Sequence, residues 1–418
     1  MSEYYDPTLY LSTPEFPNTM GMEVILKENV DGCILSEAVE SLRERFPYFY
    51  VRARKTENDI IVVPNPLPMT VRHTWEPVIF NTEESHYHLM AVKYEGKRLA
   101  VEINHYLTDG AGFLPYMKSL LFLYLSRKTG RTLDPLGFRL PGQPIPRTET
   151  GDPFAGLDID AVKAPFYEKK PIVGFYRLNP ENVRDGHCFY MKLPEKEVMR
   201  CCRDNDASPN VLFSVLIARA VRRIDPESEK TISIAIGVDH KAMLGNYDNY
   251  RMYASTAKVD FPKCREKEDI RKMCTIARGK LMLQVQPENS LWYLKTVKTR
   301  FDMLKDTPLE EKADWVAKEA ALPRFTATVS YLRSKGFGQL DQYIEEIYTL
   351  ADPGVTDVVC EVCCMNHCFY LLFLQSFGDQ RLFHTFIREL SELEIPCEVK
   401  RREQLRLSSI SWKKADQL

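Results

Sequence analysis

The sequence has no long apolar run. Its most apolar stretch, Phe113 to Leu125, is interrupted by Lys118, whereas a helix that crosses a bilayer needs about 20 consecutive apolar residues. We therefore expect no membrane span and interpret the stretch as a core or interfacial helix. Residues 1–16 also lack the basic and apolar segments of a secretion signal, which favours a cytoplasmic location.

Neither sign of charge is in excess. The 56 basic and 58 acidic residues give a formal net charge of −2, so electrostatics gives no reason to expect nucleic acid as a partner. The hydrophobic fraction of 44% and the charged fraction of 27% are typical of soluble globular proteins. A chain of 418 residues can bury a large core without disulfides, in two or three domains or one two-lobed unit.

The cysteines do not have a disulfide pattern. Their number, 11, is odd, and paired frameworks are typical of small exported chains, so we expect reduced thiols. One group has the density of a zinc site: Cys360, Cys363, Cys364, His367 and Cys368. The surrounding segment alternates like a β hairpin, which would place its thiols on opposite faces. We therefore expect no metal site.

The sequence has no short repeat and no low-complexity tract, and apolar spacing predicts mixed α and β structure in both halves. In the first half, we expect strands at 21–26, 48–53, 59–63, 86–93 and 98–104, and helices at 35–46 and 113–127. Frequent prolines between 131 and 180 predict an irregular crossover. In the second half, we expect strands at 187–193, 231–239, 252–261, 325–332, 355–364 and 368–377. Expected helices there are 194–205, 210–224, 266–285, 291–304, 309–321 and 381–393, the last closing the chain.

One segment carries recognisable chemistry. The strand expected at 98–104 leads into His105, and Asp109-Gly110 follows across a turn before the next helix. An imidazole with a pKa of about 6.5 can remove a proton from a hydroxyl, amine or thiol at neutral pH. We expect His105 to be the base and Asp109 to fold back and fix the loop. The Gly110 N–H, near the start of the helix, is a candidate donor to a developing oxyanion.

The pattern His105-x-x-x-Asp109-Gly110 resembles the HxxxDG motif of a large acyltransferase superfamily. That superfamily includes chloramphenicol acetyltransferase, carnitine acyltransferases, plant BAHD enzymes, alcohol acetyltransferases and the condensation domains of nonribosomal peptide synthetases. The order of elements is similar over most of the chain, and residues 42–47 (LRERFP) resemble an "RHP"-like segment. The resemblance implies two chloramphenicol-acetyltransferase-like α/β sandwich lobes with the active-site tunnel between them. We expect an N-terminal lobe at 1–140, a Pro-rich crossover linker at 141–185 and a C-terminal lobe at 186–418.

The resemblance also implies partners for the motif. In the superfamily the Asp is held by an Arg, often in a "VDxR" segment of the second lobe. The matching stretch here ends in Lys241, which takes the place of that Arg, and Arg251 is an alternative partner for Asp109. Ser330 lies where related enzymes place a hydroxyl that contacts the reaction intermediate, although an ordinary strand serine is the alternative. Asn104 occupies the first position of the condensation-type "HHxxxDG" pattern.

The function implied is transfer of an acyl group from a thioester donor, acyl-CoA or an acyl carrier protein, to a hydroxyl or amine on a small molecule. His105 would be the general base, without a cofactor and without a covalent acyl-enzyme, because the motif supplies no paired nucleophile. A monomer would suffice, since one chain holds both lobes. Two alternatives stay open: a free-standing condensation-type protein that forms amides from carrier-bound acyl groups, and a member that binds without catalysis. The basic residues 400–402 are interpreted as a solvated face.

Overall fold

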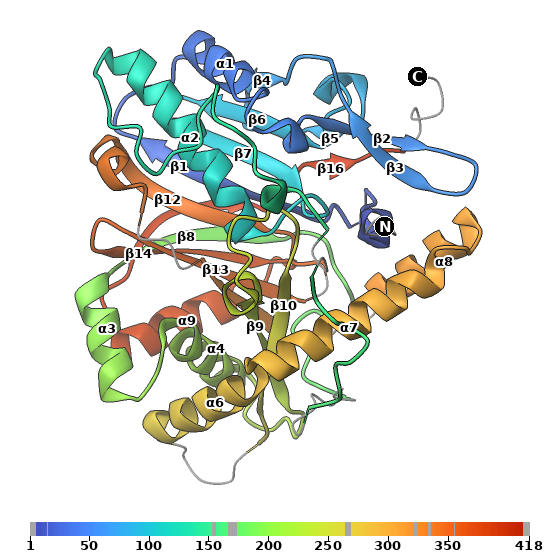
Figure 1. The fold of residues 1–418 in the computed structure, drawn as a ribbon. Helices are drawn as coiled ribbons and strands as arrows, with labels where there is room; N and C mark the ends of the chain where they lie inside the picture. The colour runs from blue at the N-terminus through green and yellow to red at the C-terminus, as the bar shows by residue number, and fades with distance from the viewer. Residues whose placement is uncertain are drawn as a thin grey trace.

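The computed structural model describes residues 6–14, 16–152, 156–165, 174–263, 269–321, 325–332, 336–354 and 356–412. Across these ranges the chain forms two stacked lobes, each with a sheet covered by helices (Figure 1). The predicted mixed α/β class and the two-lobed arrangement are confirmed. Among the described helices, none has the length and apolar character needed to cross a bilayer.

The N-terminal lobe is built on a sheet with strand order β12-β1-β7-β6-β4. Its strands are β1 (Thr19–Leu26), β4 (Val71–His73), β6 (Met90–Glu95), β7 (Arg98–Asn104) and β12 (Ile344–Ala351). Beside it lie α1 (Gly32–Ser41), α2 (Gly110–Thr129), the hairpin β2 (Val51–Lys55)–β3 (Ile60–Pro64), and β5 (Ile79–Phe80), which pairs with β16 (Ser409–Ile410). Because β7 pairs with both β1 and β6, the strand that leads into the motif lies in the middle of the sheet.

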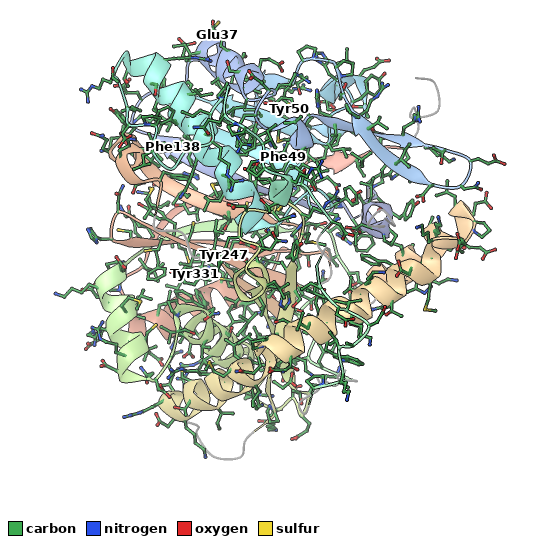
Figure 2. The ribbon with its side chains drawn as sticks, in the orientation of Figure 1. Glu37, Phe49, Tyr50, Phe138, Tyr247 and Tyr331 are labelled. Carbon is green, nitrogen blue, oxygen red and sulfur yellow. The ribbon has the colours of Figure 1, made fainter. Side chains whose placement is uncertain are left out.

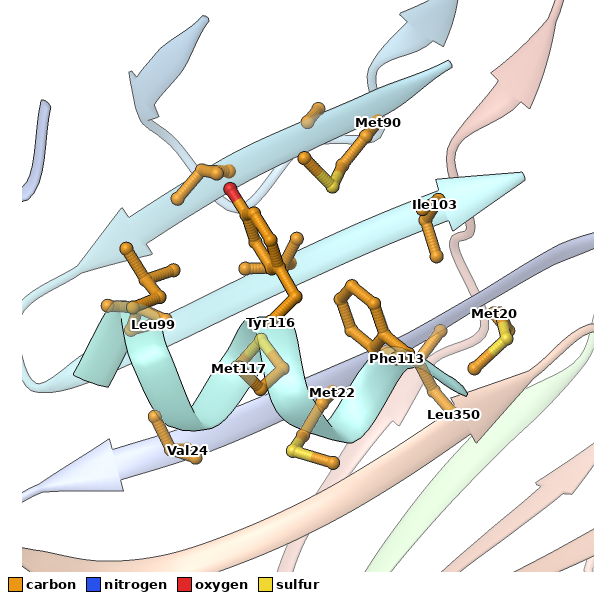
Figure 3. Packing of buried hydrophobic residues seen from close by; sticks show 14 of the residues in the cluster. Met20, Met22, Val24, Met90, Leu99, Ile103, Phe113, Tyr116, Met117 and Leu350 are labelled. Atoms are coloured by element: carbon orange, nitrogen blue, oxygen red, sulfur yellow. The ribbon is translucent and has the colours of Figure 1, made fainter. Parts of the chain in front are cut away.

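Helix α2 fixes the motif to this sheet. Figure 3 shows Phe113, Tyr116 and Met117 lying over strands β1 and β7. These residues are three and four positions apart and therefore share one face of the helix, and all three are fully buried. Opposite them lie strand residues such as Met22 and Ile103, which project to the same side of the sheet because side chains alternate along a strand.

The C-terminal lobe is built on a larger sheet with strand order β10-β9-β11-β13-β14-β8-β15. Its strands are β8 (His187–Pro194), β9 (Ile232–Asp239), β10 (Ala254–Phe261), β11 (Ala327–Tyr331), β13 (Val358–Met365), β14 (Cys368–Gln375) and β15 (Glu398–Gln404). The helices that accompany them are α3 (Glu195–Asp204), α4 (Pro209–Ile224), α5 (Lys241–Leu244), α6 (Ile270–Gln284), α7 (Pro287–Leu304), α8 (Leu309–Ala321) and α9 (Arg381–Glu392). Helices α6 to α8 form a long arm that crosses toward the N-terminal lobe (Figure 1).

The two faces of this larger sheet have different partners. Cys360 and Val362 of β13 belong to the core beneath the helices, whereas Val359 and Cys363 belong to the core of the N-terminal lobe. The alternating strand therefore separates the thiols of the zinc-like group onto opposite faces, as its pattern predicts. Figure 2 shows side chains filling both lobes, with Tyr50 in the N-terminal lobe and Tyr331 of β11 in the C-terminal lobe.

Three expectations from the sequence are corrected. Helix α1 ends at Ser41 instead of running to Phe46, and Pro47 opens a separate 3-10 turn, η2 (Pro47–Phe49). Helix α9 does not close the chain, because β15 and β16 follow it. Residues 400–402 are not simply a solvated face, since they lie in β15 and Arg401 donates to the buried Glu23 carboxylate at 2.8 Å.

Candidate active site

His105 lies immediately after β7, and its ring is fixed by one hydrogen bond. The imidazole Nδ1 is 2.8 Å from the backbone carbonyl oxygen of Thr108, and the His105 N–H donates to the Asn18 carbonyl at 2.7 Å. A carbonyl oxygen can only accept a hydrogen bond, so the ring hydrogen is on Nδ1. The other nitrogen, Nε2, therefore carries the lone pair. The side chain is half-buried.

Hydrogen bonds from neighbouring residues fix the loop that carries His105. The fully buried Asn104 accepts the Tyr106 N–H at 3.1 Å and donates to the Ser12 hydroxyl at 2.9 Å. The Tyr48 hydroxyl, from the turn that follows the "RHP"-like segment, donates to the Leu107 carbonyl at 2.6 Å. Because these contacts satisfy buried polar groups, the position that carries a His in the condensation-type pattern is here a structural Asn.

Asp109 points toward the C-terminal lobe. It is the N-cap of α2, where it accepts the Gly112 N–H at 2.8 Å, and it also accepts the Tyr253 N–H at 2.8 Å. The Lys241 ammonium contacts the same carboxylate. Asp109 is 3% exposed and Lys241 is 1% exposed. None of the partners named here is the imidazole, and Tyr253 and Lys241 belong to the second lobe, so the carboxylate ties the loop to that lobe.

Of the two predicted partners of Asp109, the structure places Lys241 against it. Lys241 opens α5 directly after β9, and its backbone N–H donates to Asp239 at 2.9 Å. Arg251 instead donates from Nε to the Thr150 carbonyl at 3.2 Å, and its guanidinium lies 5.7 Å from the centre of the Tyr48 ring. A Lys therefore contacts Asp109 where the motif resemblance implies an Arg, as a point charge without a bidentate fork.

The two glycines at the start of α2 are in close contact with the other lobe. A β-carbon on Gly110 would lie 3.4 Å from Leu332 Cδ1, which is ordinary contact. A β-carbon on Gly112 would lie 2.3 Å from the Tyr250 carbonyl oxygen and 2.6 Å from the Thr108 hydroxyl oxygen. The sequence motif ends at Gly110, but the residue that cannot carry a side chain is Gly112.

Replacing Gly112 with Ala should lower the free energy of unfolding by about 1–3 kcal/mol, because the added methyl group must displace the Tyr250 backbone. Denaturant unfolding monitored by circular dichroism would measure the change. The matched control is Gly279→Ala in α6, where a β-carbon would have nothing within 4 Å. That variant should be as stable as wild type or more stable by up to about 1 kcal/mol. Equal stability of the two variants would contradict the close packing of the lobes at Gly112.

A buried ion pair joins the N-terminal lobe to the crossover and the C-terminal lobe. Arg45 donates to both carboxylate oxygens of Glu149 at 2.6 and 2.7 Å, and the Tyr250 hydroxyl donates to the same group at 2.7 Å. Burial alone would raise the pKa of Glu149, but hydrogen bonds from Arg45 and Tyr250 hold that pKa below its ordinary value. Neither Glu149 nor Tyr250 is predicted from the sequence. The signal for Glu149 is an acidic residue in a Pro-rich crossover.

Ser330 lies on the face of the larger sheet that looks toward the N-terminal lobe. It is two residues before Leu332, so both side chains project to the same side of the chain, and Leu332 packs against the N-terminal core beside Gly110. The neighbouring strand β9 has Gly237 at this level. A β-carbon on Gly237 would be 3.8 Å from the Ser330 hydroxyl oxygen, and Gly237 itself is exposed. Ser330 therefore borders an open part of the seam.

Comparisons with known proteins identify the fold of the chain. No family model and no curated protein matches it. Solved structures match over nearly the whole length. The condensation domain of the monacolin K polyketide synthase MokA is 12% identical with a TM-score of 0.55, covering 94% of this chain and 96% of that one. The trichothecene 15-O-acetyltransferase TRI3 of Fusarium sporotrichioides is 10% identical with a TM-score of 0.58, covering 91% and 90%.

A third match is F. sporotrichioides TRI101, solved with coenzyme A and T-2. It is 9% identical with a TM-score of 0.56, covering 94% of this chain and 98% of that one. At such identities the matches establish the shared fold. The resemblance predicted from the HxxxDG motif is thus confirmed at the level of the architecture, which is that of condensation domains and acetyltransferases with two chloramphenicol-acetyltransferase-like lobes.

Proposed function

We propose that the protein is an acyltransferase in which His105 Nε2 removes the proton of a hydroxyl or amine as it attacks a thioester carbonyl. The observation that carries the proposal is the hydrogen bond from His105 Nδ1 to the Thr108 carbonyl at 2.8 Å. This bond holds the imidazole in the tautomer whose Nε2 can accept a proton, which is what a general base requires. The ring is also not sealed in the core, since it is half-buried.

The reaction balances without a cofactor. The acceptor gives its proton to Nε2 and forms a bond to the thioester carbon, which becomes a tetrahedral oxyanion. The oxyanion then collapses, the carbon–sulfur bond breaks, and the imidazolium returns the proton to the departing thiolate. Gly110 N–H and the Ser330 hydroxyl are the donors we assign to the oxyanion. Asp109 takes no part in the proton transfer, since its oxygens accept from Gly112, Tyr253 and Lys241.

A covalent acyl-enzyme is not required. The thiolate, not the thiol, is the reactive form of cysteine, and burial raises the pKa of thiols such as those of Cys360 and Cys363. We therefore propose direct transfer, with the donor and the acceptor bound together in a passage between the lobes. Holding both substrates in one site supplies much of the advantage over reaction in solution.

Acyl-CoA is the donor we favour, because a structure with this fold, TRI101, contains coenzyme A. The match to a condensation domain supports the second candidate, amide formation from carrier-bound acyl groups. Asn104 counts against that candidate, because it replaces the first His of the condensation-type pattern and is occupied with Ser12 and Tyr106. The contact between Lys241 and Asp109 counts against a protein that binds without catalysis, because the ion pair that the motif implies is still present.

Measuring thiol release distinguishes these candidates. The purified protein is incubated with one acyl group presented either as acyl-CoA or on a phosphopantetheinyl carrier protein, with a panel of small alcohols and amines. We expect acceptor-dependent release of coenzyme A and formation of the matching ester or amide. Product from the carrier alone would favour the condensation-type reaction. No turnover with either donor would contradict the proposed activity.

A further inference from the structure

Glu361 is an acidic residue in the middle of an otherwise apolar strand, β13 (VVCEVCCM). Its side chain is 6% exposed. The Thr349 hydroxyl of β12 donates to Glu361 Oε2 at 2.9 Å, and the Ser330 hydroxyl of β11 lies near enough to the same carboxyl group to lower its pKa. Ser330 and Glu361 are also paired directly across the parallel strands β11 and β13. Burying a carboxyl group costs free energy unless hydrogen bonds replace those it made with water.

Glu361 lies on the face of the larger sheet that looks toward the N-terminal lobe, as Ser330 does. Val359 and Cys363, two residues to either side on β13, pack against the N-terminal lobe, so Glu361 faces the seam as well. Ser330 lies between this closed side and the open side at Gly237, which is exposed. The Ser330 hydroxyl can therefore turn either inward, to Glu361, or outward, to the seam.

The protonation state of Glu361 decides which way that hydroxyl donates. A hydroxyl has one hydrogen, and an ionised carboxylate can only accept. When Glu361 is ionised, Ser330 must donate its hydrogen to it. When Glu361 is neutral, its own O–H can donate to the Ser330 oxygen, and the Ser330 hydrogen becomes available to a group in the seam.

The surroundings of Glu361 place its titration near neutrality. Burial raises the pKa of Glu361 to about 7, against the opposing effect of hydrogen bonds from Thr349 and Ser330. The thiols of Cys360 and Cys363, on the same strand, interact with its charge. Burial raises the pKa of both thiols, so they remain neutral in the range in which Glu361 titrates.

We propose that Glu361 is a positioning residue that sets the direction of the Ser330 hydrogen bond, so that Ser330 stabilises the tetrahedral oxyanion only while Glu361 is protonated. The inference rests on the proposed acyl transfer. No proton leaves the Glu361–Ser330 pair during the reaction. Ionised Glu361 is inhibitory for two reasons: it takes the Ser330 hydrogen, and it brings a second negative charge toward the oxyanion.

The test is the dependence of kcat on pH. The folded-state pKa is raised, so the competent protonated form is complete well below pH 7 and is lost as the pH rises through about 7. Wild-type kcat should therefore fall on the alkaline side by about tenfold or more, and at most by the 10²–10³-fold typical of losing one oxyanion donor. Glu361→Gln should keep the acid limb that a general base imposes and remove the alkaline fall, because its amide donates to Ser330 at every pH.

Further variants test the roles of Ser330 and of the Glu361 charge. Ser330→Ala should be slow at every pH, and adding Glu361→Gln to it should change nothing more. Thr349→Val removes a donor that lowers the pKa of Glu361, so it should move the alkaline fall to higher pH. Asp352→Asn is the matched control, since burial raises the pKa of Asp352 to about 6 but its carboxylate accepts the Asn18 N–H at 3.1 Å. That variant should keep the fall.

The outcomes separate this inference from the proposed function. Turnover with an alkaline fall that persists in Glu361→Gln would overturn the role of Glu361 and leave the acyl transfer standing. A Glu361→Gln variant that is equally slow at all pH values, with wild-type circular dichroism, would also overturn it, because the amide should rescue Ser330. Absence of thioester turnover in the wild-type protein at every pH would overturn both proposals together.

Discussion

Replacing His105 with Ala should lower acyl transfer by at least about a hundredfold while the protein stays folded. General-base catalysis contributes typically 10²–10⁴-fold, and we assign the whole of that contribution to Nε2. The fold should tolerate the change, because the ring is half-buried and makes one hydrogen bond, to Thr108, while the backbone bond to Asn18 is unaffected. The measurement is kcat with saturating acyl-CoA and acceptor, together with a thermal unfolding curve.

A matched control separates the loss of a base from the loss of any histidine. His384→Ala, at an exposed position on α9, should transfer acyl groups at the wild-type rate. Added imidazole should restore part of the activity of His105→Ala if the space left by the ring admits it, because a free base can then take the proton. Turnover within a few-fold of wild type in His105→Ala, with neither donor nor acceptor altered, would remove His105 as the base.

The His105–Gly110 motif could be predicted because its sequence signals lie within a few neighbouring residues. Its partner Lys241 could be predicted from the resemblance to the acyltransferase superfamily. The alternating strand before His105 and the apolar helix after Gly110 can be recognised from periodicity within a few residues. Lys241 follows a β-branched strand, and the VDxK segment that contains it resembles the VDxR segment of the superfamily. Helix α2 begins at Gly110, three residues earlier than its apolar pattern indicates, because Asp109 supplies the cap.

The parts that were missed depend on contacts between distant segments. Strand β12 pairs with β1 more than 300 residues away in sequence, as the register of Met20 with Ala351 shows. No strand is among the elements predicted for 344–351, and a period-2 pattern does not identify the sheet that a strand joins. The basic residues at 400–402 were misinterpreted for the same reason, since the partner of Arg401, Glu23, is 378 residues away. Charged residues are buried almost only when paired, and a pair cannot be recognised from one member.

The same contacts connect segments from the two predicted lobes. The boundaries 1–140, 141–185 and 186–418 remain a prediction, but β12 and β16 lie in sheets with N-terminal strands. The C-terminal half of the chain therefore contributes structure to the lobe that carries His105. The lobes are therefore joined by C-terminal strands that pair with N-terminal ones and by buried polar ties, such as Arg45 with Glu149.

Breaking the buried pair between Asp109 and Lys241 should have the largest effect on stability. Asp109→Ala leaves the Lys241 ammonium, which is 1% exposed, without its partner, and the loss of one member of a buried pair costs about 3–5 kcal/mol. Loss of the helix cap adds about 1 kcal/mol. Denaturant unfolding would measure this change, and acyl transfer should fall with it, because the His105 loop is then no longer tied to the second lobe.

The double variant Asp109→Asn with Lys241→Met distinguishes a structural Asp109 from an electrostatic one. Asn keeps an oxygen for the Gly112 N–H and remains a good cap, while Met replaces the Lys stem without a charge. Replacing both charged partners with neutral groups is often close to neutral for stability, so the double variant should be more stable than either single variant. If Asp109 only anchors the loop, kcat should recover together with stability. A double variant that is stable yet still slow would show that the negative charge itself acts on His105 or on the transition state.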